Sequence, residues 1–211
     1  FNEWLSTKDA THMCGNFEET LILPFPKNDA DLVFYSRDSL NNWEEVTRIN
    51  IDRTLIEEVQ NEVKTKIIPL NTVNKLMEKR LDVVIIPVGY TKQEKDKMIK
   101  DLNTFNSYFF SISPYSEAKD KINIVGIEDY SSYSGIPGLK PVTVPSNELG
   151  VTYNTFGSER YIMTQNMWTL MDKVNDVPCD ALILMCNSNV YGGGGIYNYY
   201  ATCYVGEKSR E

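Results

Sequence analysis

The sequence predicts an α/β protein with a mainly parallel sheet flanked by helices, preceded by part of a β-sandwich domain. Up to about residue 55, apolar residues alternate with polar ones in short runs, which is typical of strands with one solvent-facing side. From residue 81 onward the apolar runs are continuous, as in strands buried on both faces, and a run with helical spacing follows the first of them. We therefore divide the chain into residues 1–55, a connector at 56–80 and residues 81–211.

The first part is predicted to hold three strands. FEETLILPFP covers residues 17–26, DLVFYSR covers 31–37 and NNWEEVTRINID covers 41–52, with turn-forming residues between them. Three strands are too few to close a sandwich core by themselves, so this part is predicted to be incomplete. The charged residues that follow predict a partly helical connector, which Pro69 interrupts.

The second part is predicted to hold three buried strands. They are DVVIIP at 82–87, KINIVGIE at 121–128 and ALILMC at 181–186. Because a helical segment is predicted between each strand and the next, the strands are expected to pair in parallel.

Two helices are predicted between these strands. The first follows Thr91, which forms a capping-box pattern with Glu94, and the second begins at Ser158. Both carry an apolar stripe at helical spacing, which we interpret as core rather than as a ligand groove. The stripes consist of Met98, Leu102, Phe105 and Phe109, and of Met163, Met167, Leu170, Met171 and Val174. Residues 129–157, rich in Ser, Gly, Pro and Asn, are predicted to be the least ordered internal segment.

Composition excludes two kinds of partner. The chain has 29 acidic and 21 basic residues, a net charge of −8, and no cluster of Lys and Arg among aromatic residues. This distribution argues against binding to nucleic acid or to an anionic membrane surface. No apolar run approaches the roughly 18 to 20 residues of a membrane span. The opening residues FNEWLSTKDA also lack the basic and apolar regions of a signal peptide.

Most motifs that carry chemistry are missing from the sequence. It contains no Walker loop, no GxGxxG after the first buried strand and no GxSxG elbow. The single histidine, His12, cannot build a histidine-based zinc site or a Ser-His relay. The cysteines match no zinc-knuckle pattern, and Cys186 at the end of a buried strand is interpreted as a small core residue. The cysteines are Cys14, Cys179, Cys186 and Cys203. We therefore assign no catalytic residue and no metal ligand within the chain.

Carboxylates lie at the ends of two predicted strands. Asp82 precedes the first, and Glu128 and Asp129 follow the second. Sites in α/β sheets form at strand ends, but charged strand boundaries are also ordinary. The sequence leaves both interpretations open.

The run YGGGGIYNYYATCYV, residues 191–205, is the most unusual stretch of the chain. It cannot be a phosphate loop, because β-branched and aromatic residues of a strand, not a helix, follow the glycines. Glycines beside an exposed strand allow another backbone to approach closely, as when a peptide adds to a sheet edge. A hairpin corner is the alternative interpretation.

Several longer segments resemble the IgA metallopeptidase family, zinc endopeptidases related to the metzincins. They are GYTKQEKDKMIKD at 89–101, SPYSEAKDKINI at 113–124, NTFGSERYIMT at 154–164 and CNSNVYGGGGIYNYYA at 186–201. Residues 23–46 also resemble the end of that family's N-terminal β-sandwich domain. The resemblance implies that residues 81–211 are the N-terminal portion of a zincin-like catalytic domain.

The resemblance also implies a role for the glycine run. In such peptidases this segment is expected to form the sheet edge above the catalytic cleft. The substrate-binding residues implied here are Tyr191, Gly192, Gly193, Gly194, Gly195, Ile196 and Tyr197. The next element should be a helix with HExxH, in which two histidines bind zinc and the glutamate activates water. That helix is expected beyond Glu211, so the chain is expected to be a fragment that is inactive alone, with zinc bound only in the parent protein.

The sequence thus predicts part of a secreted, periplasmic or cell-surface zinc endopeptidase that acts on a protein or peptide substrate. A non-enzymatic module that binds peptides or glycans through the aromatic residues around the glycine run is the alternative.

Overall fold

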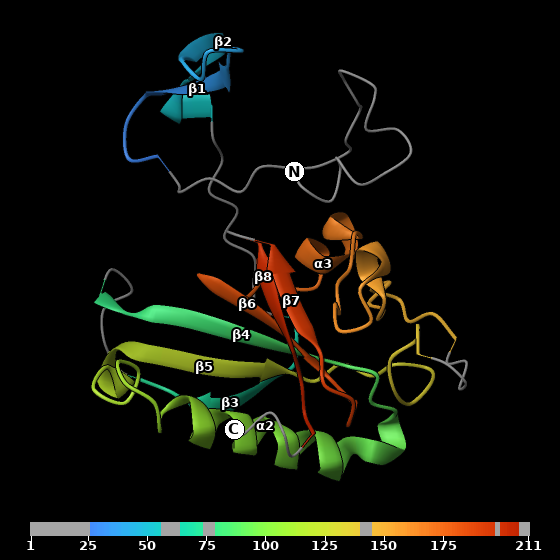
Figure 1. Cartoon of the computed structure of the whole chain (residues 1–211). Helices are drawn as coiled ribbons and strands as arrows, with labels where there is room; N and C mark the ends of the chain where they lie inside the picture. Colours follow the sequence, from blue (N-terminus) through green and yellow to red (C-terminus); the bar gives the residue numbers. More distant parts are fainter. Residues whose placement is uncertain (1–25, 56–63, 74–78, 140–144, 197–198, 207–211) are drawn as a thin grey trace. The chain divides into compact units, whose positions relative to one another are not determined.

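The computed structural model describes residues 26–55, 64–73, 79–139, 145–196 and 199–206 (Figure 1). They fall into two units, a smaller one within residues 21–61 and a larger one from residue 62 onward. The predicted strand at 17–26 lies outside the described residues except for Pro26, and so does much of the predicted connector.

The smaller unit is a β-hairpin. Strands β1 (Ala30–Arg37) and β2 (Trp43–Ile51) pair antiparallel, which confirms the two strands predicted here. The Asp38 carboxylate closes the turn by accepting the N–H groups of Leu40 at 2.9 Å and Asn42 at 2.8 Å. Trp43 and other large apolar side chains of β2 are exposed, so the described hairpin has no core of its own.

The larger unit is built on a mixed sheet of six strands, with the order β3-β5-β4-β6-β8-β7. Strands β5, β4, β6 and β8 are parallel, while β3 and β7 pair antiparallel at the two edges. This pairing confirms the parallel arrangement predicted for residues 82–87, 121–128 and 181–186. The strands are β3 (Ile67–Asn71), β4 (Leu81–Val88), β5 (Ile122–Ile127), β6 (Ala181–Cys186), β7 (Gly193–Ile196) and β8 (Tyr200–Tyr204).

Strand β3 lies within the segment that the sequence predicted to be a connector. Pro69 does not interrupt a helix but sits inside this strand, next to an irregularity in the pairing with β5. Proline lacks a backbone N–H, and an edge strand such as β3 tolerates this loss because only one side must pair.

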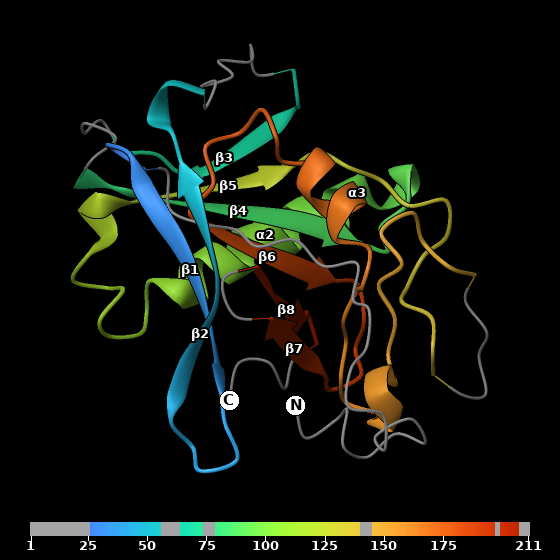
Figure 2. The same ribbon diagram turned by 90° about the horizontal axis from the view of Figure 1, so that it is seen from above.

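Helix α2 (Lys95–Phe109) covers one face of the sheet (Figures 1 and 2). The predicted capping box is confirmed, since Glu94 accepts the N–H of Thr91 at 2.9 Å. The predicted stripe also faces the core: Met98 and Leu102 are fully buried, and two phenylalanines of the helix pack beside them. These side chains meet the β4 and β5 residues Val83, Ile85, Ile122 and Ile124.

The opposite face is covered by the short helix α3 (Met167–Asp172) and by irregular chain. The helix predicted to begin at Ser158 is confirmed only in its later part, as α3. Its predicted start is wrong, because the backbone there makes β-bridges, Met163 with Thr152 and Tyr161 with Gly193. Later residues of the predicted stripe are nevertheless buried, Leu170 completely. The sheet thus has one long helix on one face, and the prediction of a fully helix-flanked sheet is only partly confirmed.

Irregular chain from residue 129 to 157 contributes to the core of this second face. Ile136, Leu149, Val151 and Tyr153 are all buried. Apolar side chains thus anchor parts of this segment, whereas its residues 140–144 are outside the described ranges, and its rank as the least ordered internal segment stays a prediction.

Candidate functional site

The glycine run forms an edge of the sheet. Strand β7 pairs antiparallel with β8 on one side only, and it is the last strand in the order. The edge position agrees with the sequence prediction, whereas Tyr197 is outside the described residues. Tyr191, before the glycines, is 62% exposed, and its ring meets the Tyr204 ring edge-on at 5.6 Å.

A segment of the same chain lies against the outer side of β7. The N–H of Gly193 donates to the Arg160 carbonyl at 2.9 Å, and the N–H of Ile162 donates to the Gly193 carbonyl at 3.1 Å. We call residues 160–164 the strap. Arg160 and Ile162 are thus hydrogen-bonded to the edge at which the resemblance implied contact with a substrate.

Side chains of β8 hold the strap over the sheet. The Thr202 hydroxyl donates to the Ile162 carbonyl at 2.6 Å. The Tyr200 hydroxyl accepts the Thr164 N–H at 2.9 Å and donates to the Thr164 carbonyl at 2.6 Å. Both of these side chains are less than a tenth exposed. Local sequence patterns could not indicate these bonds, because the partners are 36 to 40 residues apart.

Close packing against other segments of the same chain explains why these positions are occupied by glycine. A Cβ at Gly192 would lie 2.6 Å from Tyr153 Cε1 and 2.9 Å from the Arg160 carbonyl oxygen. A Cβ at Gly194 would lie 3.1 Å from Met163 Cγ, and one at Gly195 would lie 2.7 Å from the Tyr200 carbonyl oxygen. Each glycine therefore has a structural reason that needs no substrate.

An apolar groove runs along the α2 side of the sheet, where α2 leaves β6 and β8 uncovered. It consists of two hollows of about 290 and 540 Å³, and both are lined by Phe109 and Tyr115. The first ends at Met185 and Cys203, and the second reaches Gly195 on the β7 edge. The groove therefore begins beside the edge strand.

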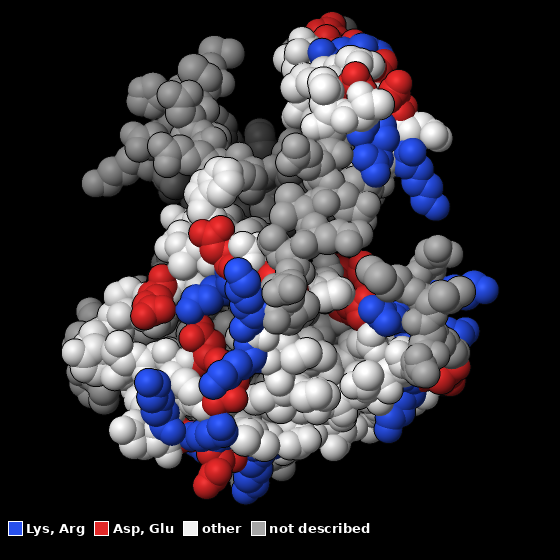
Figure 3. Space-filling view, turned by 180° about the vertical axis from the view of Figure 1, so that it is seen from behind, with Lys and Arg blue, Asp and Glu red and all other residues white. Residues whose placement is uncertain are grey.

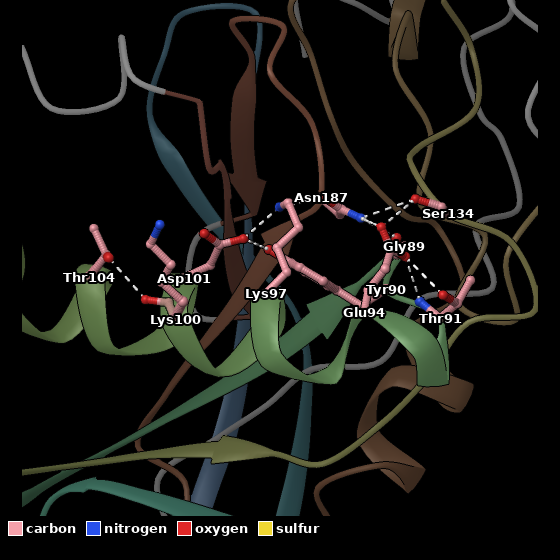
Figure 4. Close-up of polar contacts among 10 residues, drawn as sticks. All are labelled: Gly89, Tyr90, Thr91, Glu94, Lys97, Lys100, Asp101, Thr104, Ser134 and Asn187. Atoms are coloured by element: carbon pink, nitrogen blue, oxygen red, sulfur yellow. Dashed lines mark hydrogen bonds and ion pairs between the residues drawn. The ribbon is translucent and has the colours of Figure 1, made fainter.

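A polar network occupies the carboxyl ends of β4 and β6 (Figure 4). The chain runs from β4 to β5 on one side and from β6 to β8 on the other, so this is the point where α/β sheets usually bind ligands. The Asn187 amide donates to the Gly89 carbonyl at 2.7 Å and to the Glu94 carboxylate at 3.2 Å. Lys97 bridges the Asn187 oxygen at 2.8 Å and Asp101 at 2.6 Å.

The network leaves no room for a ligand at Gly89. A Cβ there would lie 2.4 Å from the Gly135 carbonyl oxygen, and the Gly135 N–H donates to the Gly89 carbonyl at 2.8 Å. Burial raises the pKa of Glu94, but hydrogen bonds from Thr91, Ser134 and Asn187 outweigh it and bring this pKa below its usual value. We conclude that these polar groups join the loop after β5 to the ends of β4 and β6.

The strand-end carboxylates do not converge on one site. Asp82 accepts the Asn123 amide at 2.6 Å and pairs with Arg80 at 3.1 Å. Glu128 pairs with Lys95 at 2.9 Å, and Asp129 pairs with Lys173 at 2.8 Å. Each carboxylate links neighbouring elements, which is the ordinary role that the sequence left open.

Across the described ranges, no three His, Cys, Asp or Glu side chains group as metal ligands would. Cys186 is fully buried, as predicted, and burial raises its pKa well above the usual value. Burial also raises the pKa of Cys203 to about 12. Both thiols thus behave as small core groups, which agrees with the interpretation of Cys186. His12 and Cys14 fall outside the described residues.

The surface drawn in Figure 3 carries acidic and basic side chains next to one another. Such mixing creates no strong field of one sign on this face. No helix within the described residues has the length and apolar character needed to cross a membrane.

Comparison with known families assigns the chain to the metallopeptidases. The family model described as IgA Peptidase M64 matches residues 69–209, and the one described as Peptidase M64 N-terminus matches residues 1–48. The chain therefore belongs to the IgA peptidase M64 family, as the resemblance of its segments indicated. A search of the curated proteins found no match.

Proposed function

We propose that the chain provides the scaffold and the substrate-side edge of a secreted zinc endopeptidase with a zincin-like catalytic domain. The observation that carries the proposal is the glycine strand β7 at the sheet edge, next to an apolar groove, within a chain that matches a metallopeptidase family. The extracytoplasmic location rests on the family resemblance alone.

The β7 edge is proposed to bind an extended peptide by main-chain hydrogen bonds. A strand edge offers N–H and C=O groups to any peptide backbone, whatever its side chains. Such binding suits an enzyme whose substrate is a protein chain. Tyr191 and Ile196, both exposed, flank the glycines and are available for side-chain contacts.

The apolar groove is proposed to hold the helix that bears the metal ligands. Its walls are sheet residues of β6 and β8 and the aromatic residues of α2, which together suit the apolar stripe of an amphipathic helix. A helix in the groove would lie beside Gly195. It would therefore bring a metal near a peptide on the β7 edge.

The described side chains do not fit a zinc site, so we derive no catalytic step through the metal. The proposed ligands belong to residues outside the described ranges. Bound zinc would supply a Lewis acid and an activated water. The described chain contributes the platform that orients the substrate.

Bound zinc and casein cleavage test the proposal. Two proteins are compared, the 211-residue chain and the longest form in which the same reading frame continues into HExxH. We expect the longer form to bind about one zinc and to cleave casein until a chelator is added. The shorter chain is expected to do neither.

Chelator-sensitive cleavage by the 211-residue chain would overturn the placement of the ligands. A reading frame without HExxH, combined with casein binding by the chain, would favour the non-enzymatic binding module instead.

A further inference from the structure

The strap closes one part of the β7 edge. Because successive residues of an antiparallel strand bond alternately to opposite sides, Gly193 and Gly195 point their N–H and C=O groups away from β8. The strap residues Arg160 and Ile162 already bond both groups of Gly193. Among the described residues, none bonds the outward groups of Gly195.

The strap is too firmly held for a peptide to displace it at low cost. Thr202 and Tyr200 bond its backbone, and the Thr164 hydroxyl donates to the Leu149 carbonyl. Thr164 is 1% exposed, Tyr200 5% and Thr202 7%. Displacement would leave these buried polar groups without partners, which costs more than a new hydrogen bond returns.

We infer that the strap sets the register of peptide binding on β7. An extended peptide can form its main-chain pair at Gly195 but not at Gly193. The strap thus limits how far a substrate extends along the edge. The inference rests on the proposed function, since it assumes that a peptide adds to this strand.

Amide exchange by NMR on the 211-residue chain labelled with ¹⁵N-glycine tests the inference. Without peptide, we expect the Gly193 amide to exchange at least about tenfold more slowly than the Gly195 amide, the factor that about 1.4 kcal/mol of protection gives. With β-casein as the probe, the Gly195 amide is expected to become protected while Gly193 stays unchanged.

Two variants loosen the strap without changing its volume greatly. Thr202→Val and Tyr200→Phe each remove a hydroxyl that bonds the strap. We expect faster exchange at Gly193 in both, and casein protection that now spreads to Gly193. Thr47→Val and Tyr35→Phe, at exposed positions of the β1–β2 hairpin, are the matched controls and should behave like the unaltered chain.

The possible results separate the two proposals. Casein protection of Gly193 in the unaltered chain, or equal exchange of the two amides without casein, would overturn the inference and leave the peptidase proposal intact. Protection of neither glycine would overturn edge binding and with it the inference. Zinc-dependent cleavage by the longer form would then still support the peptidase.

Discussion

At the scale of single residues, the glycine run is compatible with two approaching backbones, that of a peptide substrate and that of the chain itself. The sequence indicated that a backbone approaches the glycines, and the structure identifies an approaching backbone as the chain's own strap. The sequence could not identify this partner, because a run of glycines indicates close packing around the backbone but does not indicate which segment packs there. The capping box at Thr91 and Glu94 was predictable because both residues lie in one turn.

Alanine substitution should rank the glycines by their packing. Gly192→Ala places a Cβ 2.6 Å from the Tyr153 ring, whereas the nearest atoms to a Cβ at Gly194 are Met163 Cγ at 3.1 Å and the Ile162 carbonyl oxygen at 3.2 Å. We expect Gly192→Ala to lower the free energy of unfolding by about 1–3 kcal/mol, as overpacking does, and Gly194→Ala to lower it less. Urea denaturation measures both. An equal loss in the two variants would contradict this ranking.

The Glu94 carboxylate should make stability depend on acid pH. Because its pKa in the folded chain is lowered, the ionised form adds stability above the usual pKa of 4.5, and this stability is lost as the pH falls from there through the lowered pKa. Glu94→Gln should be less stable at neutral pH and should lose less stability on acidification. Urea midpoints at several pH values test this, with exposed Glu159→Gln as the control. An unchanged pH profile in Glu94→Gln would show that the carboxylate does not contribute.

At the scale of elements, the buried parallel strands were predictable and the short irregular ones were not. Continuous apolar runs mark strands covered on both faces, and β4, β5 and β6 have this environment. Strand β3 contains a proline and the strap has helical apolar spacing, so local pattern pointed away from strand structure in both. Pairing with distant residues decided their conformation.

Helix α2 should depend on its central leucine. Leu102 is fully buried, and its Cδ1 fills the space above Gly126, where a Cβ would lie 2.8 Å away. Leu102→Ala would leave a cavity there and should lower the free energy of unfolding by about 2–5 kcal/mol. Leu40→Ala, at a side chain that is 80% exposed, should change it by less than about 0.5 kcal/mol. Chemical denaturation of both variants provides the comparison, and similar losses would argue against a packed α2.

At the scale of the whole molecule, the apolar groove is the largest feature that the sequence did not locate. Its lining comes from two stretches that are far apart in the sequence, residues 81–115 with β4 and α2 and residues 180–205 with β6, β7 and β8. Only the fold shows that this apolar surface reaches the β7 edge at Gly195 and Ile196.

An uncovered groove should make the 211-residue chain self-associate. Burial of apolar surface favours association, and Tyr115 and Ile112 are each more than 40% exposed at the groove. Ala201→Lys places a charge in the groove and should shift sedimentation velocity profiles towards the monomer. Asn103→Lys, at an exposed position of α2 that does not line the groove, tests for a general effect of charge. A concentration-independent monomer in the unaltered chain would contradict the prediction.

The two units should differ in their protection from exchange. The β1–β2 hairpin has no buried residue, whereas most of β4 is buried on both faces. Amide exchange followed by mass spectrometry should therefore be complete far sooner in residues 30–51 than in residues 81–88. Comparable rates in the two segments would imply that the hairpin has a cover outside the described residues.

The strap also affects the kind of aggregate that the chain forms at high concentration. Fibrils grow when an open strand edge pairs with the next molecule over many successive residues. On β7, Arg160 and Ile162 already bond the outward backbone groups of Gly193. Among the described glycines of this strand, Gly195 is then the one whose outward N–H and C=O groups are open to another chain. A single open residue is too short an edge for further molecules to pair with in a growing fibril. Association through the β7 edge should therefore produce species that do not bind thioflavin, whereas loosening the strap should allow amyloid growth from this edge.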